Sequence, residues 1–152
     1  MPAGTGIPLV IQLGKWRRQI TIDVAPCVDN VLPMGTARLP RNQSEGNIPL
    51  TAISTGRVDT LECLLRKIGI SDSEFTNPGG TGRMRVYQGM GDLSTTTTTR
   101  AARIDGNTPT EAVLTGSTSG AGEWSRYDQI LLPCEGSEYT ATAPPNARTN
   151  RQ

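Results

Sequence analysis

The first part of the chain alternates between apolar and polar residues with the period of a β-strand. Residues 7–13 (Ile-Pro-Leu-Val-Ile-Gln-Leu) are rich in β-forming side chains, and Gly14-Lys15 provides turn material. One parity of residues 16–24 holds Trp16, Arg18, Ile20, Ile22 and Val24, and the other holds Arg17, Gln19, Thr21 and Asp23. A period of two with β-branched residues is typical of a half-buried strand. The pattern therefore predicts an antiparallel hairpin over residues 1–25.

A long segment without periodicity follows this hairpin. Residues 26–46 contain Pro26, Pro33 and Pro40 together with Gly35 and several asparagines. Because about twenty residues is long for a loop inside a compact domain, we interpret residues 26–46 as a linker. The second domain is then expected over residues 47–140.

The clearest helix of the chain follows a strand expected over residues 48–55. Asp59 is a good N-cap residue, and Glu62 three residues later completes a capping-box pattern. One apolar stripe with helical spacing follows: Leu61, Leu64, Leu65 and Ile68. Gly69 suits the helix end, and residues 83–88 alternate as a further strand. Strand, crossover helix and strand form a βαβ unit, so this part is expected to be an α/β domain with a parallel sheet.

The remaining segments are less regular. Residues 108–114 suit a helical turn behind Thr110, and residues 127–136 resemble a buried strand that ends in a tight turn. The threonine run at residues 95–99 is expected to be a solvated extended segment. The polar residues 141–152 are expected to form a disordered tail.

The composition of the chain argues against several classes of function. Fifteen basic residues nearly balance fourteen acidic ones, so a nucleic-acid partner is not expected. No apolar run approaches the length needed to cross a bilayer, so no membrane insertion is expected. The chain has no histidine, which excludes Ser-His-Asp triads, Cys-His dyads and His-bearing metal sites within it.

Cys134 is the strongest candidate for chemistry in this sequence. It follows a predicted parallel strand and precedes Glu135-Gly136, which is where open α/β sheets bind ligands. A thiol at that position could act as a nucleophile, with Glu135 as the nearest acid or base. The alternative is a bystander or buried cysteine, which is common for packing reasons alone.

Cys27 and Cys63 form a second candidate pair. On the predicted helix, Cys63 points away from the apolar stripe, and Cys27 lies just after the second hairpin strand. An exposed helical thiol is explained if the two are joined in a disulfide, which leaves one free thiol from the odd count. Three reduced cysteines fit the spacing equally well, so both possibilities stay open here.

Two other clusters have simpler explanations than binding. Residues 77–82 (Asn-Pro-Gly-Gly-Thr-Gly) lack the Gly-Lys-Ser/Thr of a phosphate loop and lead into a strand rather than a helix. Residues 15–18 (Lys-Trp-Arg-Arg) are more typical of a solvated hairpin tip than of a nucleic-acid patch. The acidic residues are scattered, so no cofactor and no metal site are predicted.

Four stretches resemble large, poorly characterised secreted or cell-surface proteins of myxobacteria and related bacteria. They are residues 7–19 (IPLVIQLGKWRRQ), 38–42 (RLPRN), 63–75 (CLLRKIGI with Glu74-Phe75) and 127–136 (YDQILLPCEG). The resemblance implies that the hairpin ends a carboxypeptidase-regulatory-like or immunoglobulin-like β-sandwich. It also implies that the second part begins a flavodoxin-like, glutamine-amidotransferase-like α/β domain. Because neither fold is complete, we expect an incomplete fold.

The resemblance further implies export and a disulfide-permissive setting, which favours the bridge between Cys27 and Cys63. Residues 1–4 (Met-Pro-Ala-Gly) lack the basic and apolar regions of a signal peptide, so the extracellular or cell-surface location rests on the resemblance alone. The leading interpretation is a non-catalytic structural or adhesive module of an extracellular bacterial surface protein. Its partners would be other domains of a longer parent chain or surface proteins, with the ligand unknown. The alternative is a Cys-dependent hydrolase or amidotransferase-like domain with Cys134 as nucleophile.

Overall fold

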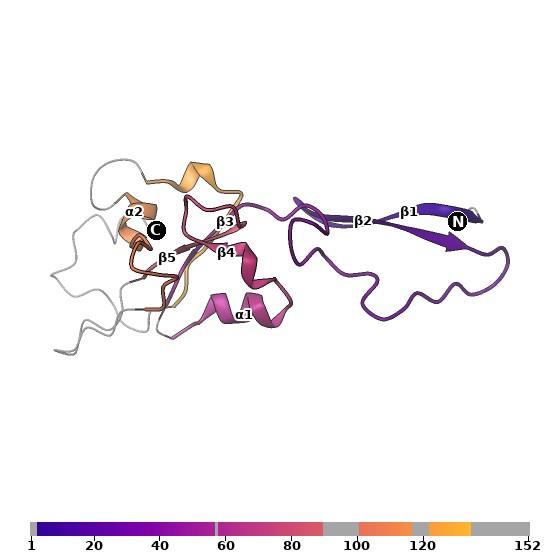
Figure 1. The fold of residues 1–152 in the computed structure, drawn as a ribbon, viewed down its shortest axis with the longest axis horizontal. Coiled ribbons are helices and arrows are strands. Elements are labelled where there is room, and N and C mark those ends of the chain that lie inside the picture. The colour runs from indigo at the N-terminus through magenta and orange to yellow at the C-terminus, as the bar shows by residue number, and fades with distance from the viewer. Residues whose placement is uncertain (1–2, 57, 90–100, 117–121, 135–152) are drawn as a thin grey trace. The chain divides into compact units, whose positions relative to one another are not determined.

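The computed structural model describes residues 3–56, 58–89, 101–116 and 122–134 (Figure 1). The chain divides into two compact units, Met1–Ile48 and Pro49–Gln152. The first holds an antiparallel hairpin and the second a four-stranded parallel sheet with few helices, so the predicted mixed α/β class is confirmed. Four predictions fall outside the described residues: the threonine run 95–99, Glu135, Gly136 and the tail 141–152.

The hairpin of the first unit joins β1 (Gly4–Leu13) to β2 (Trp16–Val24). The register pairs Leu9 with Ile20 and Leu13 with Trp16, and a bulge lies between Gly4 and Ile7. Gly14 in the turn has a φ of 57°, a left-handed conformation that glycine adopts without strain. The predicted hairpin is therefore confirmed, with β1 three residues longer than expected at its start.

One face of the hairpin is apolar and is only half-buried. Its side chains are Ile7, Leu9, Ile11, Leu13, Trp16, Arg18, Ile20, Ile22 and Val24, of which only Arg18 is charged. No described residue of β1 or β2 is buried, and Leu13 is 69% exposed. A two-stranded hairpin is at best marginally stable in water unless its apolar face is covered.

Residues 26–46, expected to be a linker, bond back to the hairpin. The Trp16 indole donates a hydrogen bond to the Pro40 carbonyl (3.1 Å), and the Arg18 guanidinium donates to the Thr36 carbonyl (3.3 Å). Backbone hydrogen bonds also join Arg17 and Asn47 in both directions. The segment thus belongs to the hairpin unit by its contacts.

The same segment is organised around the Glu45 carboxylate. Arg38 donates to both oxygens of Glu45, at 2.5 and 2.8 Å, and Arg41 donates through its side chain and its backbone N–H. The hydrogen bonds from Arg38, followed by those from Arg41, hold the pKa of Glu45 well below its usual range. A bidentate arginine–carboxylate pair fixes geometry more strongly than a single ion pair does.

The second unit is built on a parallel sheet with the strand order β4-β5-β3-β6. The strands are β3 (Thr51–Ser54), β4 (Phe75–Thr76), β5 (Met84–Tyr87) and β6 (Gln129–Leu131). The central strand β3 is buried at every position and pairs with both β5 and β6. This confirms the predicted βαβ unit. Strand β4 was not predicted, because it is only two residues long and therefore shows no alternation.

Strand β6 differs from its prediction. Residues 127–136 were expected to form a buried strand, whereas β6 is an edge strand and none of its three residues is buried. The apolar run Ile130-Leu131-Leu132 suggested burial on both faces, but among the described strands β6 pairs only with β3. Short apolar runs do not by themselves distinguish central strands from edge strands.

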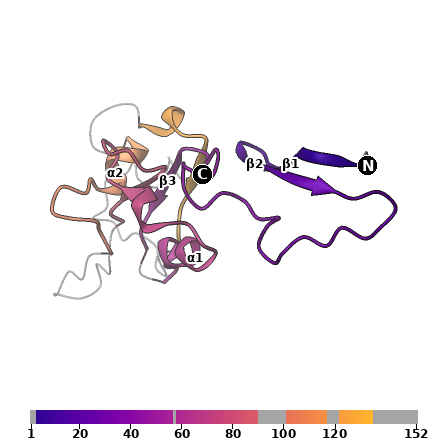
Figure 2. The same cartoon turned by 45° about the vertical axis from the view of Figure 1, so that its right-hand side comes forward.

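Two helices cover opposite faces of this sheet, as Figures 1 and 2 show. Helix α1 (Leu61–Lys67) lies on the face that carries Val86 and Phe75, and α2 (Glu111–Thr115) lies on the face that carries Ala52 and Tyr87. Short 3₁₀ turns occur at Asp72–Glu74 and Trp124–Arg126. The helical turn predicted behind Thr110 is confirmed as α2, with Thr110 at its N-cap position.

Two predictions about helix α1 were wrong. Its N-cap is Thr60 rather than Asp59, and no side chain caps it, so the capping box is not formed. The apolar stripe is only partly buried: Leu65 is 8% exposed, whereas Leu64 and Ile68 are 53% and 64% exposed. The helix is rotated so that Glu62 faces the sheet together with Leu65.

Candidate functional site

The three cysteines are free and exposed in the structure, and no disulfide joins them. The predicted Cys27–Cys63 bridge is therefore not formed here. Cys63 does point away from the buried face of α1, as its place on the predicted helix indicated. Cys27 and Cys63 belong to different compact units, the first to Met1–Ile48 and the second to Pro49–Gln152.

Cys134 lies three residues beyond the carboxyl end of β6, a strand parallel to β3, as predicted. Its backbone N–H donates a hydrogen bond to the Asp59 carboxylate at 3.2 Å. Nucleophilic cysteines are activated by a neighbouring base such as histidine or by a nearby positive charge. The contact with Asp59 places a negative charge beside Cys134 instead, and the chain contains no histidine.

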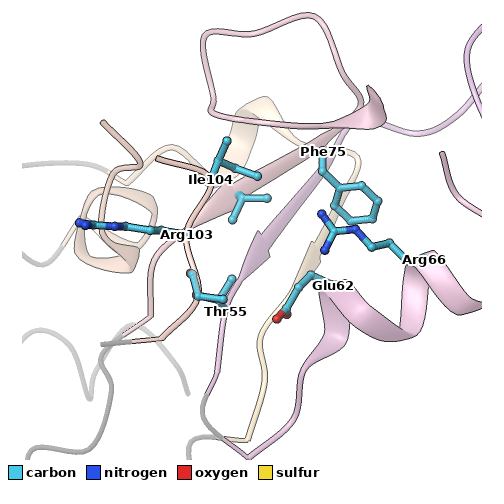
Figure 3. A pocket seen from close by; sticks show the side chains of 8 residues that line it. Thr55, Glu62, Arg66, Phe75, Arg103 and Ile104 are labelled. Carbon is cyan, nitrogen blue, oxygen red and sulfur yellow. The ribbon is translucent and has the colours of Figure 1, made fainter. Parts of the chain in front are cut away.

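A pocket lies between helix α1, the sheet and residues 102–104 (Figure 3). Its empty volume is about 280 Å³ and it opens to solvent. The lining residues are Thr55, Glu62, Arg66, Phe75, Val86, Ala102, Arg103 and Ile104. Thr55 directly follows β3, so the pocket lies toward the carboxyl end of this strand, where ligand sites of open α/β sheets are found.

Glu62 is the unusual residue of this pocket. It is 6% exposed, and its Oε2 is a buried atom without a hydrogen-bond partner among the described residues. Arg66 lies one helical turn further along α1, and its Nε donates a hydrogen bond to Asp72 Oδ1 (2.7 Å). The Arg66 guanidinium also stacks on the Phe75 ring, 4.7 Å from its centre. Arg66 is thus held against the ring and Asp72 rather than paired with Glu62.

The opposite face of the sheet contains a buried hydrogen-bonded pair. Ser54 at the end of β3 is fully buried, and its hydroxyl donates to Glu111 Oε2 on α2 at 2.6 Å. Glu111 is 4% exposed. This bond satisfies a buried carboxylate oxygen and joins α2 to the central strand, which gives the pair a structural role.

Tyr87 at the end of β5 joins a second polar cluster. Its hydroxyl donates to Glu123 Oε2 (2.5 Å) and accepts from the Tyr127 hydroxyl (2.6 Å), since Tyr87 has only one proton to donate. Burial raises the pKa of Tyr87 strongly, and its hydrogen bonds with Glu123 and Tyr127 add to the rise. Tyr87 therefore stays protonated and acts as a donor that ties residues 123–127 to the sheet.

The structure gives the glycine-rich loop a packing role. A Cβ atom on Gly82 would lie 2.1 Å from the carbonyl oxygen of Glu74. The Glu74 side chain in turn accepts a hydrogen bond from the Arg83 backbone N–H at 3.0 Å. Gly82 thus lets the chain pass Glu74 closely before it enters β5, and this accounts for glycine at that position without a phosphate ligand.

Metal-binding clusters and membrane-spanning helices are both absent from the described part of the chain. No group of three or more cysteine or acidic side chains lies close enough to hold a metal ion there. No helix in those residues is both long enough and apolar enough to span a bilayer.

The sequence correctly placed Cys134 beyond a parallel strand, but the role it predicted for Glu62, as a helix-capping residue, was wrong. The pattern around Glu62 suggested a capping residue, which would be solvated, whereas the structure buries it. The spacing of Glu62 and Leu65 by three residues was the available signal, because it places both on one helical face. What the pattern could not show was which face of α1 meets the sheet.

No protein-family model, no curated protein and no solved structure matches the chain.

Proposed function

We propose that the chain is a non-catalytic structural or adhesive module of an extracellular bacterial surface protein. In this role the hairpin β1–β2 presents its apolar face to a β-sheet of a neighbouring domain of the parent protein. The observation that carries the proposal is the incomplete cover of this apolar face, since eight of its nine side chains are only half-buried and Leu13 is exposed. An exposed apolar patch rimmed by polar residues is typical of an interaction site.

A β-sheet is the partner that best fits this surface. The opposite face of the hairpin carries Gln12, Arg17, Gln19, Thr21 and Asp23 together with Pro8 and Val10, so it is the more polar of the two faces and suits water better. Antiparallel sheets commonly have one packed face and one solvated face. Two stacked sheets would bury the Leu9–Ile20 pair at their centre.

The apolar face can be tested with a pair of adjacent substitutions. Ile20→Lys places a charge on the apolar face, and Thr21→Lys places the same charge on the polar face. We expect Ile20→Lys to reduce binding of an apolar fluorescent dye several-fold and Thr21→Lys to leave it unchanged. Thr21→Lys should not shift the urea midpoint appreciably, because surface substitutions usually change stability by less than about 0.5 kcal/mol. The urea midpoint of Ile20→Lys shows whether that variant is still folded where its dye binding is measured. Equal dye binding by the two variants would contradict an apolar face that solvent can reach.

The extracellular location requires a separate observation in cells. Antibodies against the chain should label intact, unpermeabilised bacteria that produce it. Labelling that appears only after permeabilisation would overturn the surface assignment while leaving the apolar face untouched.

The alternative function is a Cys-dependent hydrolase or amidotransferase-like domain. The exposed position of Cys134 just beyond the parallel strand β6 favours it, and the neighbouring Asp59 carboxylate disfavours it. Peptide-mapped alkylation of the native chain at neutral pH separates the two functions, with the exposed Cys63 as an internal control. We expect Cys134 and Cys63 to react at similar rates. A Cys134 rate about tenfold or more above that of Cys63 would indicate an activated thiolate and favour the enzyme.

A further inference from the structure

The pocket beside α1 contains a buried carboxylate oxygen that accepts no hydrogen bond from the described residues. Glu62 is more than nine-tenths buried, and its Oε2 has no hydrogen-bond partner among the described residues. A buried carboxylate oxygen without a partner is costly, because burial removes the water that would otherwise solvate it. Such an atom at a pocket that opens to solvent can accept a hydrogen bond from a ligand that enters the pocket.

The donors that surround Glu62 are already committed. Arg66 bonds to Asp72 and stacks on Phe75. The Thr55 hydroxyl donates to the Ala102 carbonyl at 2.7 Å and accepts from the Gly89 N–H, so its proton is not available. Figure 3 shows the Arg103 side chain directed away from Glu62. The missing donor therefore has to come from outside these residues.

The rest of the pocket defines the chemistry of that donor. Phe75, Val86 and Ile104 form the apolar walls of the pocket, and the Arg66 and Arg103 side chains line it beside them. A group that fits is small, positively charged at one end and apolar along its stem. A divalent metal fits poorly, because Ca²⁺ and Mg²⁺ need several oxygen ligands and the described residues offer no cluster of three acidic or thiol groups.

We propose that this pocket binds a primary alkylammonium group, with the ammonium donating to Glu62 and the alkyl stem packing against Phe75, Val86 and Ile104. The source is either a free alkylamine or the side chain of a lysine in a peptide, which present the same chemistry. A carboxylate and an ammonium form a charge-assisted hydrogen bond, which is shorter and stronger than a neutral one. The partial enclosure of Glu62 further strengthens the pairing because water screens it less.

The test titrates the full-length chain with n-butylammonium chloride and follows the side-chain carboxyl ¹³C signals of labelled glutamates by NMR. We expect the Glu62 signal to shift saturably, and potassium chloride at the same ionic strength to leave it unchanged. Glu62→Gln keeps the shape of the side chain and removes its charge, so affinity should fall about tenfold or more. Asp29→Asn removes an exposed acidic charge in the other unit and should leave the affinity unchanged.

Each outcome of this titration decides the proposal. No shift of the Glu62 signal, or equal affinity in Glu62→Gln, overturns it, and the wild-type carboxyl signal decides it even if that variant fails to fold. Tighter binding of n-butylguanidinium overturns the assignment to ammonium. Binding of a lysine blocked at both its α-amino and carboxyl groups, with affinity equal to that of n-butylammonium, identifies a peptide as the source. Binding of the free amine alone identifies a small molecule.

Discussion

Replacing Gly82 with alanine is expected to destabilise the second unit by about 1–3 kcal/mol or more, the usual range for overpacking. The added Cβ would lie 2.1 Å from the Glu74 carbonyl oxygen, and the obstructing atom is backbone that cannot rotate away. Relief requires Glu74 and the start of β5 to separate, which also strains the hydrogen bond from the Arg83 N–H to Glu74 Oε2. Urea unfolding followed by Trp124 fluorescence in a Trp16→Phe background measures the change within this unit.

Gly79→Ala is the matched control for this substitution. Gly79 belongs to the same loop and is exposed, and an added Cβ there would meet no other atom within 4 Å. Its φ is not positive, so alanine is expected to be neutral or to stabilise by about 0.4–1 kcal/mol through the unfolded chain. Equal effects of the two substitutions would show that close approach to Glu74 is not the reason for glycine at position 82.

Leu114→Ala is expected to lower the free energy of unfolding of the same unit by about 2–5 kcal/mol. Leu114 is fully buried and belongs to the core cluster formed with Ala52 and Tyr87. Removing its side chain leaves a cavity between α2 and the central strand β3, in a core that has few large side chains to collapse into it. Urea unfolding followed by Trp124 fluorescence in the Trp16→Phe background measures this loss of stability.

Val113→Ala on the same helix provides the comparison. Val113 is 42% exposed, so its truncation should change stability by less than about 0.5 kcal/mol. If Val113→Ala were as costly as Leu114→Ala, the effect would come from the helix itself and not from the core. A Leu114→Ala effect below about 1 kcal/mol would mean that α2 contributes little to the packing of the sheet.

The polar clusters of the second unit explain how a thin core is held together. Ser54 and Glu111 connect α2 to β3, and Tyr87 connects residues 123–127 to β5. Each bond joins segments far apart in the sequence and satisfies a buried group. Glu62 is the exception among these buried carboxylates, because its Oε2 has no such partner in the described residues.

Much of the secondary structure followed from local patterns in the sequence. Strict alternation over residues 16–24 predicted β2 with its observed bounds, and the βαβ arrangement of β3, α1 and β5 followed from the order of strand, helix and strand. These features depend on periodicity and turn residues, which act over a few positions. The absence of histidine likewise limits the possible chemistry through composition alone.

The tertiary structure decided which of these elements is covered and by what. The alternation in β1 and β2 showed that one face is apolar, but only the structure showed that residues 26–46 bond to the hairpin and leave this face half-buried. The apolar run in residues 130–132 did not reveal that β6 is an edge strand, since that depends on its neighbours. The stripe on α1 suggested a buried Leu64 and Ile68, whereas the helix turns Glu62 toward the sheet. Burial is set by contacts between distant segments, and a local pattern records the periodicity of an element without recording what packs against it.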